Sequence, residues 1–186
     1  PGFRSTRYFP GSRRRGLPQG QSGGLEARRQ NAPMPSTHLV SGDDPDIQAL
    51  TREVVAEYVV RYNDPHDDIA PVEATATWVL VRDGATPVGC GAVQRWSHSV
   101  PDAAPDTGEL KRMYVVPAAR RRGIGRLLVA ALIDAATSRG MTSLVLETGI
   151  AQPEAMGLYE AMGFVPTEVW GRYRDDPRSR CYRLEL

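Results

Sequence analysis

The segment MYVVPAARRRGIGR, residues 113–126, carries the strongest structural signal in this chain. It begins with the apolar end of a predicted strand, which Pro117 stops because proline cannot donate a ladder hydrogen bond. A basic turn follows. The helix predicted after the turn has its apolar residues on one stripe, at positions 124, 127, 128, 131, 132 and 135. This order predicts a parallel βαβ unit whose second strand lies at about residues 142–148.

The start of this predicted helix is suited to binding an anion. The first N–H groups of a helix lack intrahelical partners, and the helix dipole adds positive charge there. Gly123 and Gly125 have no Cβ atoms, so a diphosphate could approach the backbone closely. Arg121, Arg122 and Arg126 add formal charge. The pattern therefore predicts a diphosphate site made largely of peptide N–H groups.

Two other phosphate-binding motifs fit this segment less well. A dinucleotide-binding Rossmann turn needs a third glycine or alanine where Leu128 stands, and a tighter connection from the strand. A P-loop is excluded because the segment lacks Gly-Lys-Ser/Thr. A basic turn that binds no ligand is the remaining alternative.

Outward from this segment, hydrophobic periodicity predicts a mixed α/β domain over residues 36–186. Helices are expected at about residues 47–61, 122–139 and 153–163. Strands are expected at residues 37–40, 75–82, 87–96, 108–116, 142–148, 164–170 and 179–186. Asp83-Gly84 predicts the turn of a hairpin between the second and third strands.

Residues 1–35 differ from the rest of the chain. They are rich in Arg, Gly and Pro, and have too few apolar residues to offset chain entropy, so we expect a disordered extension. Seven arginines and one glutamate give this segment a charge of +6, which leaves −5 for the remainder of a chain whose net charge is +1. Three interpretations stay open: a nucleic-acid-binding arm, for which so short a basic run is weak evidence, an inert extension, or a segment before a start at Met34.

Composition narrows the class of protein. No apolar run is long enough to cross a membrane, and no signal peptide is recognisable, so we expect a cytoplasmic protein without a membrane partner. Cys90 and Cys181 are expected to be reduced thiols. The three histidines lie far apart, so the sequence predicts no metal site.

The pattern Arg120-x-x-Gly123-x-Gly125 resembles the Arg/Gln-x-x-Gly-x-Gly/Ala pyrophosphate signature of the GNAT (Gcn5-related) N-acetyltransferase superfamily. The resemblance extends upstream through ELKRMYV, residues 109–115, and downstream through LYEAMGF, residues 158–164. It implies the GNAT fold, an α/β (α+β) domain with a mixed central sheet of about seven strands flanked by about four helices. It also implies acetyl-CoA as a cosubstrate and no metal.

The resemblance implies a cofactor site as well. Backbone groups of Met113 and Val115 would bind the pantetheine arm as an added strand, and the amides of residues 121–126 would hold the pyrophosphate. Gln152 stands where many members have Asn. The complete expected set is Met113, Tyr114, Val115, Arg120, Arg121, Arg122, Gly123, Ile124, Gly125, Arg126 and Gln152.

Two residues are candidates for catalysis under the same resemblance. Tyr159 stands where a tyrosine of many members protonates the departing thiolate. Glu109 has the spacing of a general base in histone-type members, and a strand-edge glutamate paired with Lys111 or an arginine is its alternative. By strand alternation, Glu109, Lys111, Met113 and Val115 are expected on one face.

The expected function is acetyl transfer to a primary amine by direct attack, with a small-molecule or peptide acceptor. Neither cysteine matches a nucleophile position, which argues against a covalent intermediate. Acids in residues 58–68 and 171–179 would favour a cationic acceptor, although ordinary solvated loops would look the same. A non-catalytic acyl-CoA-binding regulatory module is the alternative function, and exposed edge strands could support a homodimer.

Overall fold

The computed structural model describes residues 34–63, 71–96 and 104–186. Its strands are β1 (Ser36–Val40), β2 (Thr77–Asp83), β3 (Thr86–Arg95), β4 (Thr107–Val115), β5 (Ser143–Gly149), β6 (Val165–Thr167) and β7 (Ser179–Glu185). Its helices are α2 (Pro45–Tyr62), α3 (Ile124–Ser138) and α4 (Pro153–Ala161), with short 3-10 helices η1 (Pro117–Ala119) and η2 (Gly171–Tyr173). The described residues thus hold three α-helices where about four were expected. The predicted extension lies outside the described residues, apart from positions 34 and 35.

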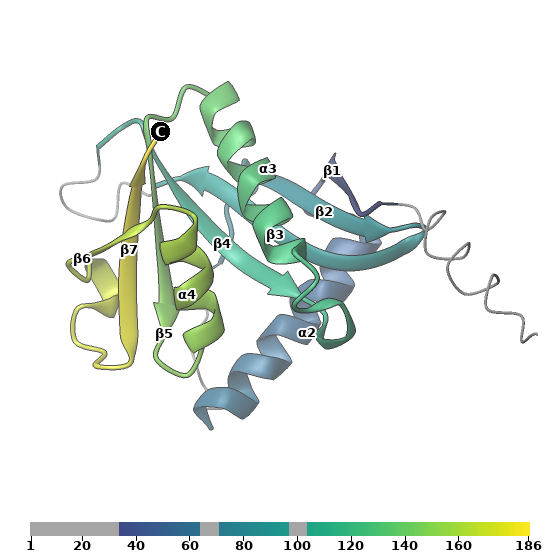
Figure 1. Cartoon of the computed structure of the whole chain (residues 1–186). Helices are drawn as coiled ribbons and strands as arrows, with labels where there is room; N and C mark the ends of the chain where they lie inside the picture. The colour runs from purple at the N-terminus through teal and green to yellow at the C-terminus, as the bar shows by residue number, and fades with distance from the viewer. Residues whose placement is uncertain (1–33, 64–70, 97–103) are drawn as a thin grey trace, which may run out of the picture. The chain divides into compact units, whose positions relative to one another are not determined.

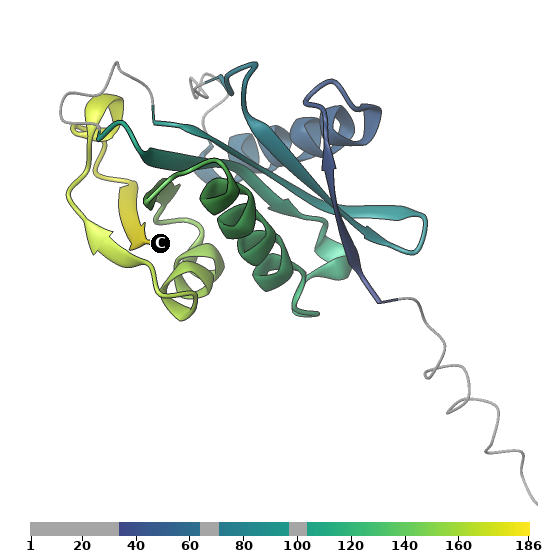
Figure 2. The ribbon, with the colours of Figure 1, turned by 90° about the horizontal axis from the view of Figure 1, so that it is seen from above.

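The seven strands form one mixed sheet in the order β1-β2-β3-β4-β5-β7-β6. Only the β4–β5 pair is parallel, and the other neighbours are antiparallel. Helix α2 covers one face of the sheet, and α3 and α4 cover the other (Figures 1 and 2). The parallel pair with α3 between its strands is the predicted βαβ unit, and it forms the centre of the sheet.

Burial on both faces explains why β2 and β3 are largely apolar. Beneath α3, the core contains Val79 and Val93 together with Leu128 and Leu132 of the helix. Beneath α2, a second cluster contains Ile47, Leu50 and Val54 of the helix with Trp78, Leu80, Cys90 and Ala92 of the sheet. Consecutive residues of β2 therefore alternate between the two clusters, as a strand requires.

Local sequence signals account for several element boundaries. The Asp44 side chain caps α2 by accepting a hydrogen bond of 2.8 Å from the Asp46 N–H. Gly140, with φ of +72°, follows α3 in the left-handed conformation that glycine adopts easily. The strand predicted at residues 164–170 was too long, because only Val165–Thr167 pairs. Phe164 and Trp170 at its ends are buried by packing against other aromatic rings, which a count of β-formers does not distinguish from pairing.

Candidate active site

The two parallel strands at the centre of the sheet pair over only part of their length. Their ladder runs from Thr107–Ser143 to Leu110–Leu146. Strand β4 continues to Val115 and β5 to Gly149, and Figure 1 shows the two strands diverging there. The β4 peptide groups that face β5 beyond Leu110 thus have no partner strand within the described residues, so an extended ligand could pair with them.

A β-bulge in β4 accompanies this divergence. Cys90 pairs with Tyr114 and Ala92 with Lys111, so Arg112 and Met113 together oppose the single residue Gly91 of β3. Arg112 has a φ of +54°, an uncommon value for a residue with a side chain. A bulge bends the strand that contains it and increases its twist, which turns the end of β4 away from β5.

The bulge also corrects the predicted alternation along β4. Glu109 and Lys111 share the α2 face with their β3 partners, but Met113 and Val115 pack against the core beneath α3. The expectation that all four share one face was therefore wrong. One extra residue reverses the side of every residue that follows it.

The start of α3 is open on its outer side. Gly123 is the N-cap residue, with φ of +83° and no side-chain cap. Its carbonyl accepts the first intrahelical hydrogen bond, from the Leu127 N–H at 3.1 Å. The N–H groups of residues 124–126 consequently lack intrahelical partners. A Cβ built on Gly123 would meet no atom within 4 Å, so this corner has room for an anion. The unpaired N–H groups and the space beside Gly123 fit the diphosphate of coenzyme A, which would lie against these N–H groups.

Gly125 has a further, packing reason to be glycine. A Cβ there would lie 2.9 Å from Leu158 Cδ2 of α4. The sequence attributed both glycines to close approach by a diphosphate. In the structure Gly123 provides the left-handed turn, and Gly125 allows α3 and α4 to approach each other.

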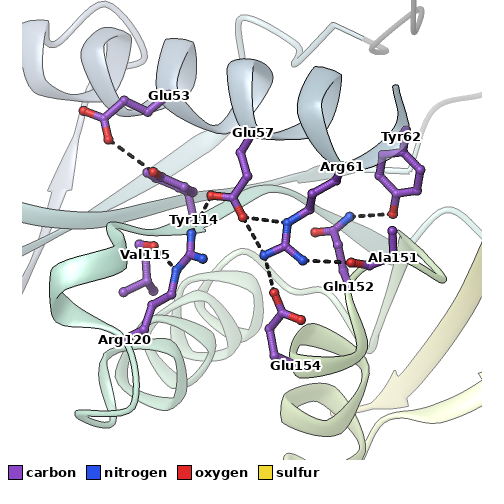
Figure 3. Close-up of polar contacts among 10 residues, drawn as sticks. All are labelled: Glu53, Glu57, Arg61, Tyr62, Tyr114, Val115, Arg120, Ala151, Gln152 and Glu154. Atoms are coloured by element: carbon purple, nitrogen blue, oxygen red, sulfur yellow. Dashed lines mark hydrogen bonds and ion pairs between the residues drawn. The ribbon is translucent and has the colours of Figure 1, made fainter. Parts of the chain in front are cut away.

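The Arg120 side chain is engaged by the protein itself. Its Nε donates to the Val115 carbonyl at 2.9 Å and its Nη2 to Glu57 Oε2 at 2.5 Å, while the guanidinium lies 5.8 Å from the centre of the Tyr114 ring (Figure 3). Arg120 thus joins the end of β4 to α2. This places it beside the expected pyrophosphate turn, where it holds the turn in position.

The other predicted arginines lie around the turn. Arg121, with φ of +61°, and Arg122 and Arg126 are exposed. Arg122 forms a 2.7 Å ion pair with Asp83, and Arg126 Nη1 lies 3.7 Å from a methionine sulfur. Their positive charge is therefore close to the open end of α3, which favours an anion there.

Helix α2 is linked to both strand ends by a polar network (Figure 3). Arg61 contacts Glu57 of its own helix, the Ala151 carbonyl at 2.8 Å, and Glu154 of α4. Although burial opposes the shift, hydrogen bonds from the arginines hold the pKa of Glu57 and Glu154 below their usual value. The network fixes α2 across the region where β4 and β5 diverge.

Three further predicted cofactor residues lie in the same region. Gln152 Nε2 donates to the Tyr62 hydroxyl at 3.1 Å, so its carboxamide is oriented by α2. The Tyr114 side chain is buried on the α2 face, and its hydroxyl donates to Glu53 at 3.2 Å. Burial, with the charge of Glu53, raises the pKa of Tyr114 to about 12. The side chain of Ile124 belongs to the core, so only its N–H group is available to a ligand.

Tyr159 lies on α4 with only 4% of its surface exposed. Its ring packs edge-on against Phe164 at 5.8 Å between centroids. Burial first, then the neighbouring Tyr58 and Glu147, raises its pKa well above the ordinary value. The phenol is therefore protonated near neutral pH and can donate a proton.

Glu109 is buried in a set of close polar contacts. Lys111 Nζ lies 3.1 Å from Oε1, and Gln94 Nε2 donates to Oε2 at 3.2 Å. The Gln94 carboxamide is itself held by the Glu73 N–H at 2.9 Å. Both carboxylate oxygens of Glu109 thus face protein donors, the arrangement of a structural ion pair.

Several residues near the diverging strands escaped the sequence analysis. Glu147 of β5 lies one position beyond the last β4–β5 pair, and its charge raises the pKa of four tyrosines that burial already raises: Tyr58, Tyr62, Tyr159 and Tyr173. A glutamate inside the otherwise apolar run SLVLET was the available signal. Of the tyrosines, Tyr159 was predicted from the family resemblance, whereas Tyr58, Tyr62 and Tyr173 gave no signal, because isolated aromatic residues usually indicate core packing.

Neither cysteine has the character of a nucleophile. Cys90 and Cys181 are both buried, and burial raises the pKa of each thiol to about 12. A thiolate is needed for attack on a thioester, and these thiols remain protonated near neutral pH. Across residues 34–63, 71–96 and 104–186, no group of three or more His, Cys, Asp or Glu side chains could hold a metal ion, and no helix could span a membrane.

Comparison with known proteins identifies the family. Residues 47–164 match the model of the acetyltransferase (GNAT) family. The chain belongs to the GNAT acetyltransferase family. This confirms the resemblance noted in the sequence, the GNAT fold and the expected enzyme class of N-acetyltransferases.

Curated relatives agree with GNAT membership. The chain is 38% identical over 102 residues to an IAA acetyltransferase of Azospirillum brasilense, a match covering 55% of this chain and 63% of that protein. It is 32% identical over 136 residues to the uncharacterised N-acetyltransferase YjgM of Escherichia coli, covering 68% and 78%. A ribosomal protein bS18-alanine N-acetyltransferase of Salmonella typhimurium is 41% identical over 68 residues, covering 37% and 46%.

Solved structures share the GNAT architecture. A Klebsiella pneumoniae protein assigned as an acyl-CoA N-acyltransferase superposes with a TM-score of 0.67 and 28% identity, covering 82% of this chain and 98% of that one. A GNAT acetyltransferase of Elizabethkingia anophelis with acetyl-CoA bound has a TM-score of 0.58 and 18% identity, covering 82% and 98%. The second similarity supports the fold alone.

Proposed function

We propose that this GNAT protein transfers an acetyl group from acetyl-CoA to a primary amine by direct attack. The observation that carries the proposal is the uncapped start of α3 beside the diverging end of β4. One element offers peptide N–H groups to a diphosphate, and the other offers unpaired strand edge to an extended arm. Together they match the two chemically distinct parts of coenzyme A.

The cosubstrate would be held mainly by backbone groups. The amides of residues 121–126 would bind the diphosphate, with Arg121, Arg122 and Arg126 adding charge. Peptide groups of Met113 and Val115 would bind the pantetheine arm. The Val115 carbonyl already accepts from Arg120, so we assign its N–H the larger part of this contact. Gln152, oriented by Tyr62, would complete the site on the α4 side.

Tyr159 would supply the proton that the departing thiolate needs. A buried phenol with a raised pKa stays protonated until the leaving group develops negative charge. The attacking amine forms the C–N bond, the C–S bond breaks, and the sulfur takes the phenolic proton. The amide nitrogen loses its extra proton and restores the phenol through solvent.

The acceptor belongs to a broad class. The names of the relatives indicate different acceptors, IAA for one protein and an alanine of ribosomal protein bS18 for another. These acceptors are properties of those proteins. For this chain we propose a small-molecule or peptide amine.

Binding and turnover test the proposal separately. Isothermal titration calorimetry should show that CoA binds at least about tenfold more tightly than pantetheine, because pantetheine lacks the diphosphate. A thiol-release assay with acetyl-CoA and a panel of primary amines should then detect turnover. Equal affinity for CoA and pantetheine would refute the α3 site. Tight CoA binding with no turnover across the panel would favour the non-catalytic acyl-CoA-binding module instead.

A further inference from the structure

We propose that Tyr62 is a positioning residue for the cosubstrate, because its side chain holds the turn between β5 and α4 in the form that receives the pantetheine arm. This inference rests on the acetyl-transfer function proposed above, and it adds the residue that shapes the cosubstrate site on its α4 side. Tyr62 is the last residue of α2, and residues 149–152 connect the end of β5 to the start of α4. Tyr62 and Gln152 meet here although 90 positions separate them in the chain (Figure 3).

The Tyr62 side chain occupies the space beside Gly149. A Cβ built on Gly149 would lie 1.8 Å from the Tyr62 hydroxyl oxygen and 2.5 Å from its Cζ, so a larger residue cannot fit while Tyr62 stays in place. Gly149 pairs with Ser179 of β7, and its φ is not positive. Its backbone conformation therefore does not require glycine, whereas the close approach of Tyr62 does.

The Tyr62 hydroxyl also orients the Gln152 side chain. Gln152 Nε2 donates to this hydroxyl at 3.1 Å, which leaves the carboxamide oxygen to accept a hydrogen bond from a ligand. The amide N–H groups of a pantetheine arm are donors of that kind. Burial raises the pKa of Tyr62 against the opposing hydrogen bonds from Gln152 and the Ala151 backbone, so the hydroxyl is neutral near pH 7.

Tyr62 is itself held in place by its neighbours. The Arg178 guanidinium lies 5.6 Å from the centre of the Tyr62 ring, and Asp176 holds that guanidinium by an ion pair of 2.9 Å. The residue before Tyr62, Arg61, donates to the Ala151 carbonyl at 2.8 Å. Two consecutive residues of α2 therefore contact the same turn, which fixes the turn against the helix.

The turn lies at the place where the arm is proposed to bind. It follows the end of β5 beyond the last β4–β5 pair, Leu110–Leu146, where the two strands have separated. The Gln152 N–H donates to the Gly149 carbonyl at 2.9 Å, so a shift at Gly149 moves Gln152 as well. Small displacements of a binding group weaken its contacts, and Tyr62 prevents them at both ends of this turn.

Tyr62→Phe is the principal test, because it keeps the ring beside Gly149 and Arg178 and removes only the hydroxyl. We expect calorimetry to show that the affinities for CoA and for pantetheine each fall about fivefold. The affinity for adenosine 3′,5′-bisphosphate, which lacks the arm, should stay within about twofold. The KM for acetyl-CoA should rise by the same factor as CoA affinity falls, with kcat changed less than about twofold.

Two further variants show whether the hydroxyl acts through Gln152. Gln152→Ala should lose as much pantetheine affinity as Tyr62→Phe, and the combined variant should lose no more than Gln152→Ala alone. Tyr182→Phe is the matched control, since it removes a hydroxyl that donates to Glu160 at 3.0 Å in the core beneath α3, and it should bind CoA like the wild type. Additive losses in the combined variant, or an equal loss of affinity for the bisphosphate, would overturn the inference.

The contact with Gly149 is tested by compensation. Gly149→Ala should lower the melting temperature of the wild type, and should lower it much less in a Tyr62→Ala background, where the obstructing ring is gone. The same decrease in both backgrounds would contradict the role of Tyr62. If the wild type binds no CoA, the proposed function itself fails. A wild type that binds CoA and acetylates an amine, with Tyr62→Phe unchanged, would refute this inference alone.

Discussion

Tyr159 and Glu109 show how burial can have opposite meanings for two polar groups. Burial keeps the Tyr159 phenol protonated, which suits a proton donor. Burial of Glu109 comes with the Lys111 ammonium 3.1 Å away, which stabilises the carboxylate where it is. The same physical effect therefore supports a catalytic role for one residue and a structural role for the other.

Replacing Tyr159 with phenylalanine should separate chemistry from binding. The ring keeps its contacts with Phe164, but the thiolate loses its proton donor. We expect kcat to fall at least about tenfold while the affinity for CoA stays nearly unchanged. Steady-state kinetics and calorimetry measure the two quantities. Wild-type turnover in this variant would refute the acid role.

Removing Lys111 should destabilise the fold more than removing the whole pair. In Lys111→Met, Glu109 is left as a buried charge without its cation, and we expect the free energy of unfolding to fall by about 3 kcal/mol. The double variant Lys111→Met/Glu109→Gln should recover most of this loss. Urea denaturation measures both, and equal losses in the single and double variants would contradict the buried-pair interpretation.

At the scale of elements, the start of α3 combines two demands. Gly123 turns the chain with φ of +83°, and Gly125 lets α4 approach the helix. The same two positions leave the first N–H groups of α3 uncovered. Packing and ligand binding are therefore linked, and substitutions here must be designed to distinguish them.

Gly125→Asp should abolish CoA binding, because it places a negative charge at the proposed diphosphate site. Its Cβ would also press on Leu158, at 2.9 Å, so stability will fall as well. Gly125→Ala is the matched control, since it adds the same Cβ without the charge. We expect both variants to lose similar thermal stability, but the aspartate to lose far more CoA affinity. Equal CoA affinity in the two variants, measured by calorimetry, would argue against the diphosphate site.

At the scale of the whole domain, α2 links the two halves of the sheet. Arg120 and Arg61 meet at Glu57, and Arg61 continues to Glu154 of α4 (Figure 3). This network crosses the place where β4 and β5 separate. It therefore supplies a connection between the halves that the missing strand pairing does not.

The network predicts a specific pH dependence of stability. The pKa values of Glu57 and Glu154 are lowered in the folded state, so their contribution to stability is complete above the ordinary glutamate pKa of 4.5 and is lost as the pH falls below it. Both groups are partly solvent-exposed, so each contributes about 1 kcal/mol or less. As the pH is lowered from about 5 to about 3, the melting temperature of the wild type should fall more steeply than that of Glu57→Gln. Parallel curves would show that the network does not stabilise the fold.

The elements of this chain follow from local properties of the sequence. The stripe of α3 and its glycine-containing start depend on residues within a few positions of one another, so periodicity and turn chemistry locate them without any distant contact. The succession of strands and helices along the chain and the family signature around Gly123 also depend only on neighbouring residues. The turn at Gly123 could therefore be predicted from the sequence. The packing role of Gly125 could not, because its contact with Leu158 joins segments over 30 positions apart.

The arrangement of the candidate site depends on contacts between distant segments. Whether β4 carries a bulge at Arg112 is settled by its register against β3, and that register moves Met113 and Val115 to the other face. The gathering of Tyr58 and Tyr173 around Glu147 likewise requires α2, β5 and η2 to pack together. Strand register and helix packing minimise the energy of the whole core at once, so no short window of sequence contains the information that places these groups.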